Sequence, residues 1–341
     1  MQKKPTEIAA VLGGGSFGTA IAAILAENGH EARLWVRDPE TAAAINAANE
    51  NKKYLPGSIL PSGVHANDDL ITTLKDATLI FVAVPSSAFV DVLQQAKEYV
   101  AEGTIVVSCT KGIAADSFQL MSQVLMEQWP QARVGVLSGP NLAKEIVEKT
   151  FTGTVIASDD DALCKRIQQA LSCDYFRVYQ SGDMYGVELG GALKNIYAIA
   201  TGMAAAMGVG DNTRGLLITR SLAEMSRYAA HLGGNPMSFL GLAGVGDLIV
   251  TCSSPLSRNY QVGYQVGKGL SVAEAVASLG QTAEGINTVK LIAERAKQLD
   301  IYMPICTGLY KILFEEKPCD EVIAGLMQGE HSYDVEFTIG L

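Results

Sequence analysis

A glycine pattern near the N-terminus constrains the fold of this chain most strongly. The apolar run Ile8–Leu12 leads into a G-x-G-x-x-G motif, and apolar residues then recur at helical spacing over Thr19–Asn28. In such a unit Gly13 allows a tight turn, Gly15 lets the backbone approach a pyrophosphate, and Gly18 lets helix and strand pack closely. The motif predicts a dinucleotide-binding domain whose first helix points its N-terminus at phosphates. A glycine-rich turn without a ligand is the alternative.

The end of the second predicted strand, Glu31–Val36, bears on which dinucleotide is bound. An NAD-binding domain places an acid there, about 20 residues beyond the glycines, to bind the ribose 2′-hydroxyl. Here Arg37 holds that place, which suits the 2′-phosphate of NADP, although a solvated arginine is also possible. Asp38 and Pro39 instead have the pattern of a helix N-cap and first helical residue. We expect NADP(H) or NAD(H) as cofactor, with Arg37 favouring NADP(H).

Further short apolar runs predict the rest of a sheet. Leu79–Ala83, Thr104–Cys109 and Arg133–Leu137 are rich in β-branched residues and have helical sequence between them, as in a parallel sheet covered on both faces. Gly153–Ala157 and Tyr175–Tyr179 predict two more strands. Because open α/β sheets bind ligands outside the carboxyl ends of their strands, Lys111 lies where it can meet one. An exposed loop lysine is the other interpretation.

The sequence changes character near residues 180 to 186. Strand patterns end after Tyr179, and helical patterns continue to the C-terminus with glycine-rich breaks, one of them at 241 to 246. We therefore expect a dinucleotide-binding Rossmann domain over residues 1–183 and a helical substrate-binding domain over 184–341. The predicted fold class is α/β, a doubly wound sheet followed by an all-α domain.

The helix predicted over Val187–Gly202 is apolar nearly all round, which is typical of a helix buried in the protein. From Gly186 to Met207 only Glu188 and Lys194 carry charge. Lys194 either lays its stem along apolar surface with its ammonium in water, or has a chemical role. Burial lowers the pKa of a lysine and makes it usable as a proton donor or acceptor. No histidine is paired in sequence with a carboxylate, so Lys194 is the proton-transfer candidate.

Two polar motifs follow in the second half. Asp247 stands alone in the glycine-rich apolar segment Gly241–Cys252, as either an N-cap or the partner of a buried cation. Ser257 precedes a helical pattern over Tyr260–Val266 and can cap that helix. The free N–H groups of the helix together with Arg258 would form an anion site, unless Arg258 is simply a surface residue.

Composition excludes several classes of protein. Hydrophobic residues make up 48% and charged residues 18%, and no apolar stretch reaches the roughly 18 uncharged residues of a membrane span. The net charge of −10 argues against binding to nucleic acid. The start of the chain lacks the apolar segment of a signal peptide, so a cytoplasmic location is expected. No spacing suggests a metal site, and free thiols are expected at Cys109, Cys164, Cys173, Cys252, Cys306 and Cys319.

These motifs together are similar to those of one enzyme family over nearly the whole chain. The chain resembles the NAD(P)-dependent glycerol-3-phosphate dehydrogenases of the bacterial biosynthetic branch. The matching stretches are Gly13–Gly18, Thr110–Ile113, Ser138–Pro140, Ala143–Glu145, Val187–Ile196, Gly241–Leu248, Ser257–Asn259 and Glu284–Gly285.

The resemblance implies a role for each matching residue. Lys194 would be the proton acceptor, and Asn195, Asp247 and Thr251 would orient it and the substrate hydroxyls. The implied cofactor contacts are Gly13, Gly15, Ser16, Phe17, Gly18, Arg37, Lys111, Ala143, Arg258, Thr282 and Glu284. The implied substrate contacts are Lys111, Gly139, Asn141, Lys194, Asp247, Ser257, Arg258 and Asn259, with Arg258 on the phosphate.

The implied reaction passes a hydride between NAD(P)H and dihydroxyacetone phosphate, and gives sn-glycerol 3-phosphate for phospholipid synthesis. The family is normally homodimeric, and its substrate is a small phosphorylated three-carbon compound. Two alternatives differ in kind. A related 2- or 3-hydroxyacid dehydrogenase would have no need of the Ser257–Asn259 motif, and a non-catalytic dinucleotide sensor would have no need of Lys194 in apolar surroundings.

Overall fold

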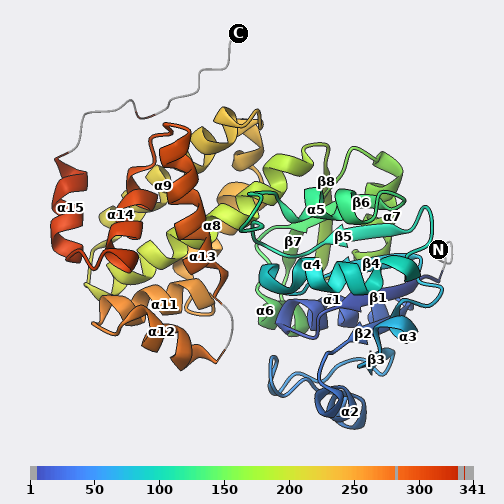
Figure 1. The fold of residues 1–341 in the computed structure, drawn as a ribbon. Helices are drawn as coiled ribbons and strands as arrows, with labels where there is room; N and C mark the ends of the chain where they lie inside the picture. Colours follow the sequence, from blue (N-terminus) through green and yellow to red (C-terminus); the bar gives the residue numbers. More distant parts are fainter. Residues whose placement is uncertain (1–5, 281–282, 329–333, 335–341) are drawn as a thin grey trace. The chain divides into compact units, whose positions relative to one another are not determined.

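The computed structural model describes residues 6–280, 283–328 and 334 of the chain (Figure 1). The chain divides into two compact units, Met1–Glu188 and Leu189–Leu341. The division lies inside the long helix α8, Met184–Ala206. A functional boundary at residues 183 and 184, where this helix begins, remains our proposal.

The first unit contains an eight-stranded sheet in the order β3-β2-β1-β4-β5-β6-β7-β8. Its pairings are parallel except that of β6 with β7, where Leu137 lies opposite Ile156 in antiparallel register. The three strands that were predicted to lie in a parallel sheet, β4, β5 and β6, do pair in parallel, whereas no direction was predicted for β7. The strands are β1 Ile8–Leu12, β2 Glu31–Trp35, β3 Val64–Asn67, β4 Leu79–Val82, β5 Ile105–Ser108, β6 Arg133–Ser138, β7 Thr152–Ala157 and β8 Phe176–Ser181.

Helices cover both faces of this sheet, as a doubly wound fold requires. Val11 of β1 belongs to a core cluster with residues of α1 and α7, whereas its neighbour Leu12 points into a second cluster with residues of α4 and α5. Successive side chains of one strand therefore pack into two separate cores, one on each face of the sheet. The helices are α1 Ser16–Glu27, α2 Pro39–Ala48, α3 Leu70–Leu74, α4 Ser86–Ala96, η1 Lys97–Tyr99, α5 Met121–Gln128, α6 Ala143–Val147 and α7 Asp161–Leu171.

The second unit consists of helices joined by turns and loops, with no strand, over residues 189–280 and 283–328. The expected break at 241 to 246 is itself mostly helical, since a π-helical turn runs directly into α10. The elements that follow α8 are α9 Asp211–His231, η2 Pro236–Leu240, η3 Leu242–Gly246, α10 Asp247–Ser253, α11 Arg258–Gly267, α12 Val272–Leu279, α13 Glu284–Gln298, α14 Pro304–Phe314 and α15 Cys319–Met327. An α/β unit followed along the chain by a helical unit confirms the predicted fold class.

Two buried glutamates cap helices, one in each unit. In the first unit, the carboxylate of Glu188 accepts hydrogen bonds from the backbone N–H and hydroxyl of Ser122, at the start of α5. In the second, Glu224 accepts the N–H of Ile305 at 2.5 Å, at the start of α14, and the Tyr197 hydroxyl at 3.2 Å. Burial raises the pKa of each carboxyl to about 7. These side chains satisfy helix N–H groups that would otherwise be buried without partners.

Among the described helices, none combines the length and the apolar character that crossing a bilayer demands. The six cysteines are free, as predicted.

Helices α8 and α11 approach each other at backbone contact distance. A Cβ built on Gly263 of α11 would lie 2.0 Å from the carbonyl oxygen of Ile199 in α8. Only glycine allows this approach, and the crossing holds the first turn of α11 at a fixed place along α8.

We expect Gly263→Ala to lower the free energy of unfolding by about 3 kcal/mol or more, because the added methyl meets rigid backbone. Gly215→Ala in α9 is the matched control, since its Cβ would meet nothing within 4 Å. That change should stabilise the protein by roughly 0.5–1 kcal/mol through helix propensity. Denaturant unfolding followed by circular dichroism measures both. Equal stability of Gly263→Ala and the parent protein would contradict the proposed close crossing.

Candidate functional site

The glycine turn between β1 and α1 has the geometry that its motif predicted. Gly13 adopts a left-handed φ of +120°, and a Cβ on Gly18 would lie 2.0 Å from the Gly13 carbonyl oxygen. A Cβ on Gly15, in contrast, would meet nothing within 4 Å. The turn is therefore tight against the sheet on one side and open at Gly15.

The opening at Gly15 coincides with the N-terminus of α1. Gly15 is the N-cap and forms no side-chain cap hydrogen bond, so the first-turn N–H groups are available to a ligand. The Ser16 hydroxyl donates to the carbonyl of Tyr54 at 3.1 Å, and Phe17 packs against the core. Backbone donors, a helix dipole and open space fit the pyrophosphate of a dinucleotide.

Arg37 and Asp38 follow β2 at the same edge of the sheet. Arg37 is exposed, and Asp38 caps α2 by accepting hydrogen bonds from the backbone N–H and the hydroxyl of Thr41. The hydrogen bond from the Thr41 hydroxyl is the main reason that the pKa of Asp38 is lowered. The predicted N-cap is confirmed, with Pro39 in the first turn of the helix.

Polar groups gather beyond the carboxyl ends of β5 and β6. The ammonium of Lys111 donates to the carbonyl of Gly139 at 3.0 Å. The side-chain amide of Asn141 donates to the Thr154 hydroxyl at 2.9 Å. The Asn141 amide oxygen and the Ser138 hydroxyl are buried without a hydrogen-bond partner in the described part of the chain. Buried polar atoms of this kind favour a bound polar group at this edge.

In the second unit, Lys194 lies in a buried ion pair. Its side chain on α8 is 7% exposed and contacts the Asp247 carboxylate, which is 1% exposed. The ammonium also donates to the Thr251 hydroxyl at 2.6 Å. Asp247 and Thr251 lie one turn apart on α10, so they present their oxygens to the same ammonium. Asp247 is thus the partner of a buried cation, and Gly246 takes the N-cap position.

A chain of amides begins beside Lys194 on the same helix. The Asn195 amide oxygen accepts from the Asn259 amide at 2.9 Å, and the Asn259 oxygen accepts the N–H of Gly285 at 3.0 Å. These two bonds join α8, the first turn of α11 and the first turn of α13.

The start of α11 carries the predicted anion-binding motif. Ser257 caps the helix by accepting the N–H of Tyr260 at 3.3 Å, as expected. Arg258 is the first helical residue and is exposed, whereas Ser257 and Asn259 are buried.

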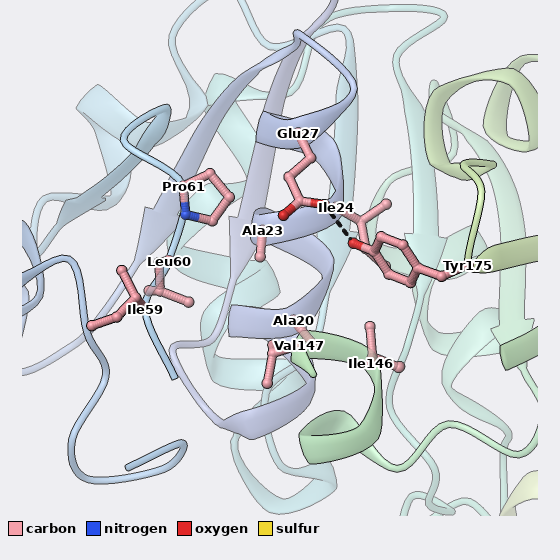
Figure 2. Close-up of a pocket in the computed structure, with 10 residues that line it drawn as sticks. All are labelled: Ala20, Ala23, Ile24, Glu27, Ile59, Leu60, Pro61, Ile146, Val147 and Tyr175. Atoms are coloured by element: carbon pink, nitrogen blue, oxygen red, sulfur yellow. Dashed lines mark hydrogen bonds between the residues drawn. The ribbon is translucent and has the colours of Figure 1, made fainter. Parts of the chain in front are cut away.

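A small cavity beside α1 in the first unit is a poor candidate for a ligand site (Figure 2). Its volume is about 10 Å³, which has room for one water molecule at most. It holds none of the predicted site residues. It is lined by Ala20, Ala23, Ile24, Glu27, Ile59, Leu60, Pro61, Ile146, Val147 and Tyr175.

Comparison with known proteins gives consistent results for both units. Residues 8–164 match the family described as NAD-dependent glycerol-3-phosphate dehydrogenase N-terminus, and residues 183–324 match the corresponding C-terminus family. The glycerol-3-phosphate dehydrogenase [NAD(P)+] of Alcanivorax borkumensis is 63% identical over 97% of each chain. The chain belongs to the NAD-dependent glycerol-3-phosphate dehydrogenase family.

Solved structures of the family have the same fold. The Coxiella burnetii glycerol-3-phosphate dehydrogenase is 36% identical, with a TM-score of 0.91 over 95% of this chain and 99% of that one. The Saccharomyces cerevisiae glycerol-3-phosphate dehydrogenase is 28% identical, with a TM-score of 0.81 over 94% of this chain and 99% of that one.

The predicted site residues of this family member fall into two groups, one in each unit. Thr282 lies outside the described residues, and the roles of all the others remain predictions. In the first unit the group comprises Gly13, Gly15, Ser16, Phe17, Gly18, Arg37, Lys111, Gly139, Asn141 and Ala143. In the second it comprises Lys194, Asn195, Asp247, Thr251, Ser257, Arg258, Asn259 and Glu284.

Sequence reasoning missed Asn51, which supports the glycine turn. This residue is fully buried, and its amide donates to the Gly14 carbonyl at 2.9 Å and to the Thr19 hydroxyl at 2.8 Å. These hydrogen bonds join residues more than thirty positions apart, so no local sequence pattern indicated them. Ser138 lies in a stretch that the sequence analysis singled out without giving this residue a role, and its buried hydroxyl lies at the end of β6.

We expect Asp247→Leu to lower the free energy of unfolding by about 3–5 kcal/mol, because it leaves the Lys194 ammonium buried without its anion. The double variant Lys194→Met/Asp247→Leu should recover most of this loss. Asp211→Ala breaks an exposed ion pair with Arg214 and should cost at most about 1 kcal/mol. Denaturant titration of the three variants tests this. A loss for Asp247→Leu no larger than that for Asp211→Ala would mean that the pair contributes nothing to the fold.

Proposed function

We infer that this protein catalyses reversible hydride transfer between NAD(P)H and dihydroxyacetone phosphate, giving sn-glycerol 3-phosphate. Similarity to enzymes named glycerol-3-phosphate dehydrogenase [NAD(P)+] over nearly the full chain supports this activity. The observation that carries the mechanism is the buried contact of Lys194 with Asp247 and Thr251.

The bound dinucleotide supplies the hydride in reduction and accepts it in oxidation. The residues of the first unit bind and orient the cofactor. The open backbone at Gly15 and the first turn of α1 take the pyrophosphate. Arg37 favours NADP(H) by offering a charge-assisted bond to the 2′-phosphate.

Lys194 moves the proton that accompanies the hydride. In reduction its Nζ donates a proton to the ketone oxygen of the substrate, and in oxidation it accepts the alcohol proton. The Asp247 carboxylate and the Thr251 hydroxyl hold the ammonium in place through the contacts described above. Burial of this group excludes water, which strengthens each of these electrostatic contacts.

Arg258 binds the phosphate of the substrate in this proposal. An acidic protein, with a net charge of −10, needs a local cation to hold an anion. The N–H groups at the start of α11 add their dipole to the same region. Asn259 joins the first turn of α11 to α8 through Asn195, so Arg258 begins a helix that is bonded to the helix carrying Lys194.

We further propose that the product supplies phospholipid synthesis, that the protein works in the cytoplasm as a homodimer, and that it binds no nucleic acid.

Two other functions remain to be separated by experiment. A 2- or 3-hydroxyacid dehydrogenase would reduce a different carbonyl substrate, and a dinucleotide sensor would bind cofactor without oxidising it.

Cofactor oxidation, followed by the absorbance of the reduced nicotinamide, tests the proposed activity. We expect oxidation of NADPH or NADH that depends on dihydroxyacetone phosphate and is much slower with dihydroxyacetone, because the latter has no phosphate for Arg258. Turnover of hydroxyacid or keto acid substrates alone would favour the first alternative. Cofactor binding without oxidation would favour the second.

The same assay locates the phosphate site. Arg258→Ala should lower kcat/KM for dihydroxyacetone phosphate. The loss should correspond to roughly 2–5 kcal/mol of transition-state stabilisation, the range found when one member of a charge pair is removed. The rate with dihydroxyacetone should change little. An equal loss for both ketones would show that Arg258 supports the fold or the cofactor instead.

A further inference from the structure

The segment of residues 51–61 lies directly against the glycine turn. Its first residue, Asn51, donates to the Gly14 carbonyl and to the Thr19 hydroxyl on α1. Three residues later, the Tyr54 carbonyl accepts the hydroxyl of Ser16 at 3.1 Å. Residues 51–54 are therefore fixed on both sides of the open position at Gly15.

The far end of this segment is also anchored on α1. Figure 2 shows Ile59, Leu60 and Pro61 lying alongside the helix, near Ala23. Leu60 is 4% exposed and belongs to the core of the first unit. The backbone of the segment thus has a defined position, which limits the region that an exposed side chain on it can reach.

Lys53 is an exposed, positively charged residue of this segment. Its Nζ lies 5.4 Å from the centre of the Tyr54 ring. Its charge also contributes to the lowered pKa of Asp38, in addition to the larger effect of the Thr41 hydroxyl. The geometry of the segment agrees with this. Asn51 donates to the Gly14 carbonyl, and a Cβ built on Gly14 would lie 2.6 Å from Cγ2 of Val36. Because Val36 directly precedes Arg37 and Asp38, the segment that carries Lys53 lies beside the end of β2.

Charge balance at the end of β2 calls for such a cation. A 2′-phosphate carries up to two negative charges, and Arg37 supplies one positive charge. The neighbouring Asp38 carboxylate is held ionised as the cap of α2 and repels an anion beside it. A second cation is needed to offset both charges.

We propose that Lys53 is a second determinant of NADP(H) specificity, acting together with Arg37 on the 2′-phosphate. This proposal rests on the dinucleotide-binding part of the proposed function and does not depend on the carbonyl substrate.

Dissociation constants of NADPH, NADH and 2′,5′-ADP, measured by calorimetry on the full-length protein, test the proposal. Lys53→Ala should weaken NADPH and 2′,5′-ADP by roughly five- to tenfold, the effect of losing one charge-assisted contact at an exposed site, and NADH by less than twofold. Lys53→Glu should widen the difference by repelling the phosphate. Lys53→Arg should bind all three ligands as the parent protein does.

Lys52 is the matched control, since it is exposed and adjacent in the same segment. Lys52→Ala should leave all three dissociation constants unchanged within twofold. Equal weakening of NADH and NADPH by Lys53→Ala would overturn the proposal, because Lys53 would then support the glycine turn itself. Equal effects of the Lys52 and Lys53 variants would also overturn it, as would no effect of either.

These outcomes are separable from the fate of the proposed function. If the protein does not reduce dihydroxyacetone phosphate but its 2′,5′-ADP binding depends on Lys53, the proposed activity is wrong and the role of Lys53 stands. If the protein reduces this ketone and Lys53→Ala leaves the cofactor preference unchanged, the proposed activity stands and the role of Lys53 is wrong.

Discussion

The buried contact between Lys194 and Asp247 is the interaction on which the second unit depends. Transfer of two charges from water to the protein interior costs several kcal/mol per ion, and only close pairing with further hydrogen bonds offsets this cost. Thr251 supplies one such bond to the ammonium. An apolar helix can therefore carry Lys194 only if α10 is held against α8 at the correct position.

Small residues hold α10 in that position. A Cβ on Gly190 of α8 would lie 2.8 Å from the carbonyl oxygen of Ala243, so the backbone before α10 rests almost on α8 itself. The π-helical turn Leu242–Gly246 then leads directly to Asp247. The glycines that looked like a helix break are thus what allows the carboxylate to reach the lysine. The same principle operates at Gly263, where α11 crosses α8 and delivers Ser257, Arg258 and Asn259 to the neighbouring turns.

Local signals and long-range contacts differ in how far the sequence revealed them. The glycine turn and the caps Asp38 and Ser257 were predictable, because each depends on residues a few positions apart. Strand β3, Val64–Asn67, was not predictable. It has only four residues, of which two are polar, and its position in the sheet depends on pairing with β2. The sequence left the role of Asp247 open between cap and counter-ion, and only its contact with α8 decided it. The antiparallel pairing of β7 and the support by Asn51 likewise arise from contacts distant in the chain.

The most direct test of this account is chemical rescue of Lys194→Ala. If the ammonium transfers the proton, turnover should fall by about 100-fold or more, the usual size of a general-acid effect, while the dissociation constant of NADPH stays near that of the parent protein. Small primary amines added to the assay should then restore part of the lost rate, in proportion to their concentration. Turnover equal to that of the parent protein, or a loss that no amine restores and that is matched by weaker NADPH binding, would contradict the assignment of Lys194 as the acid and base.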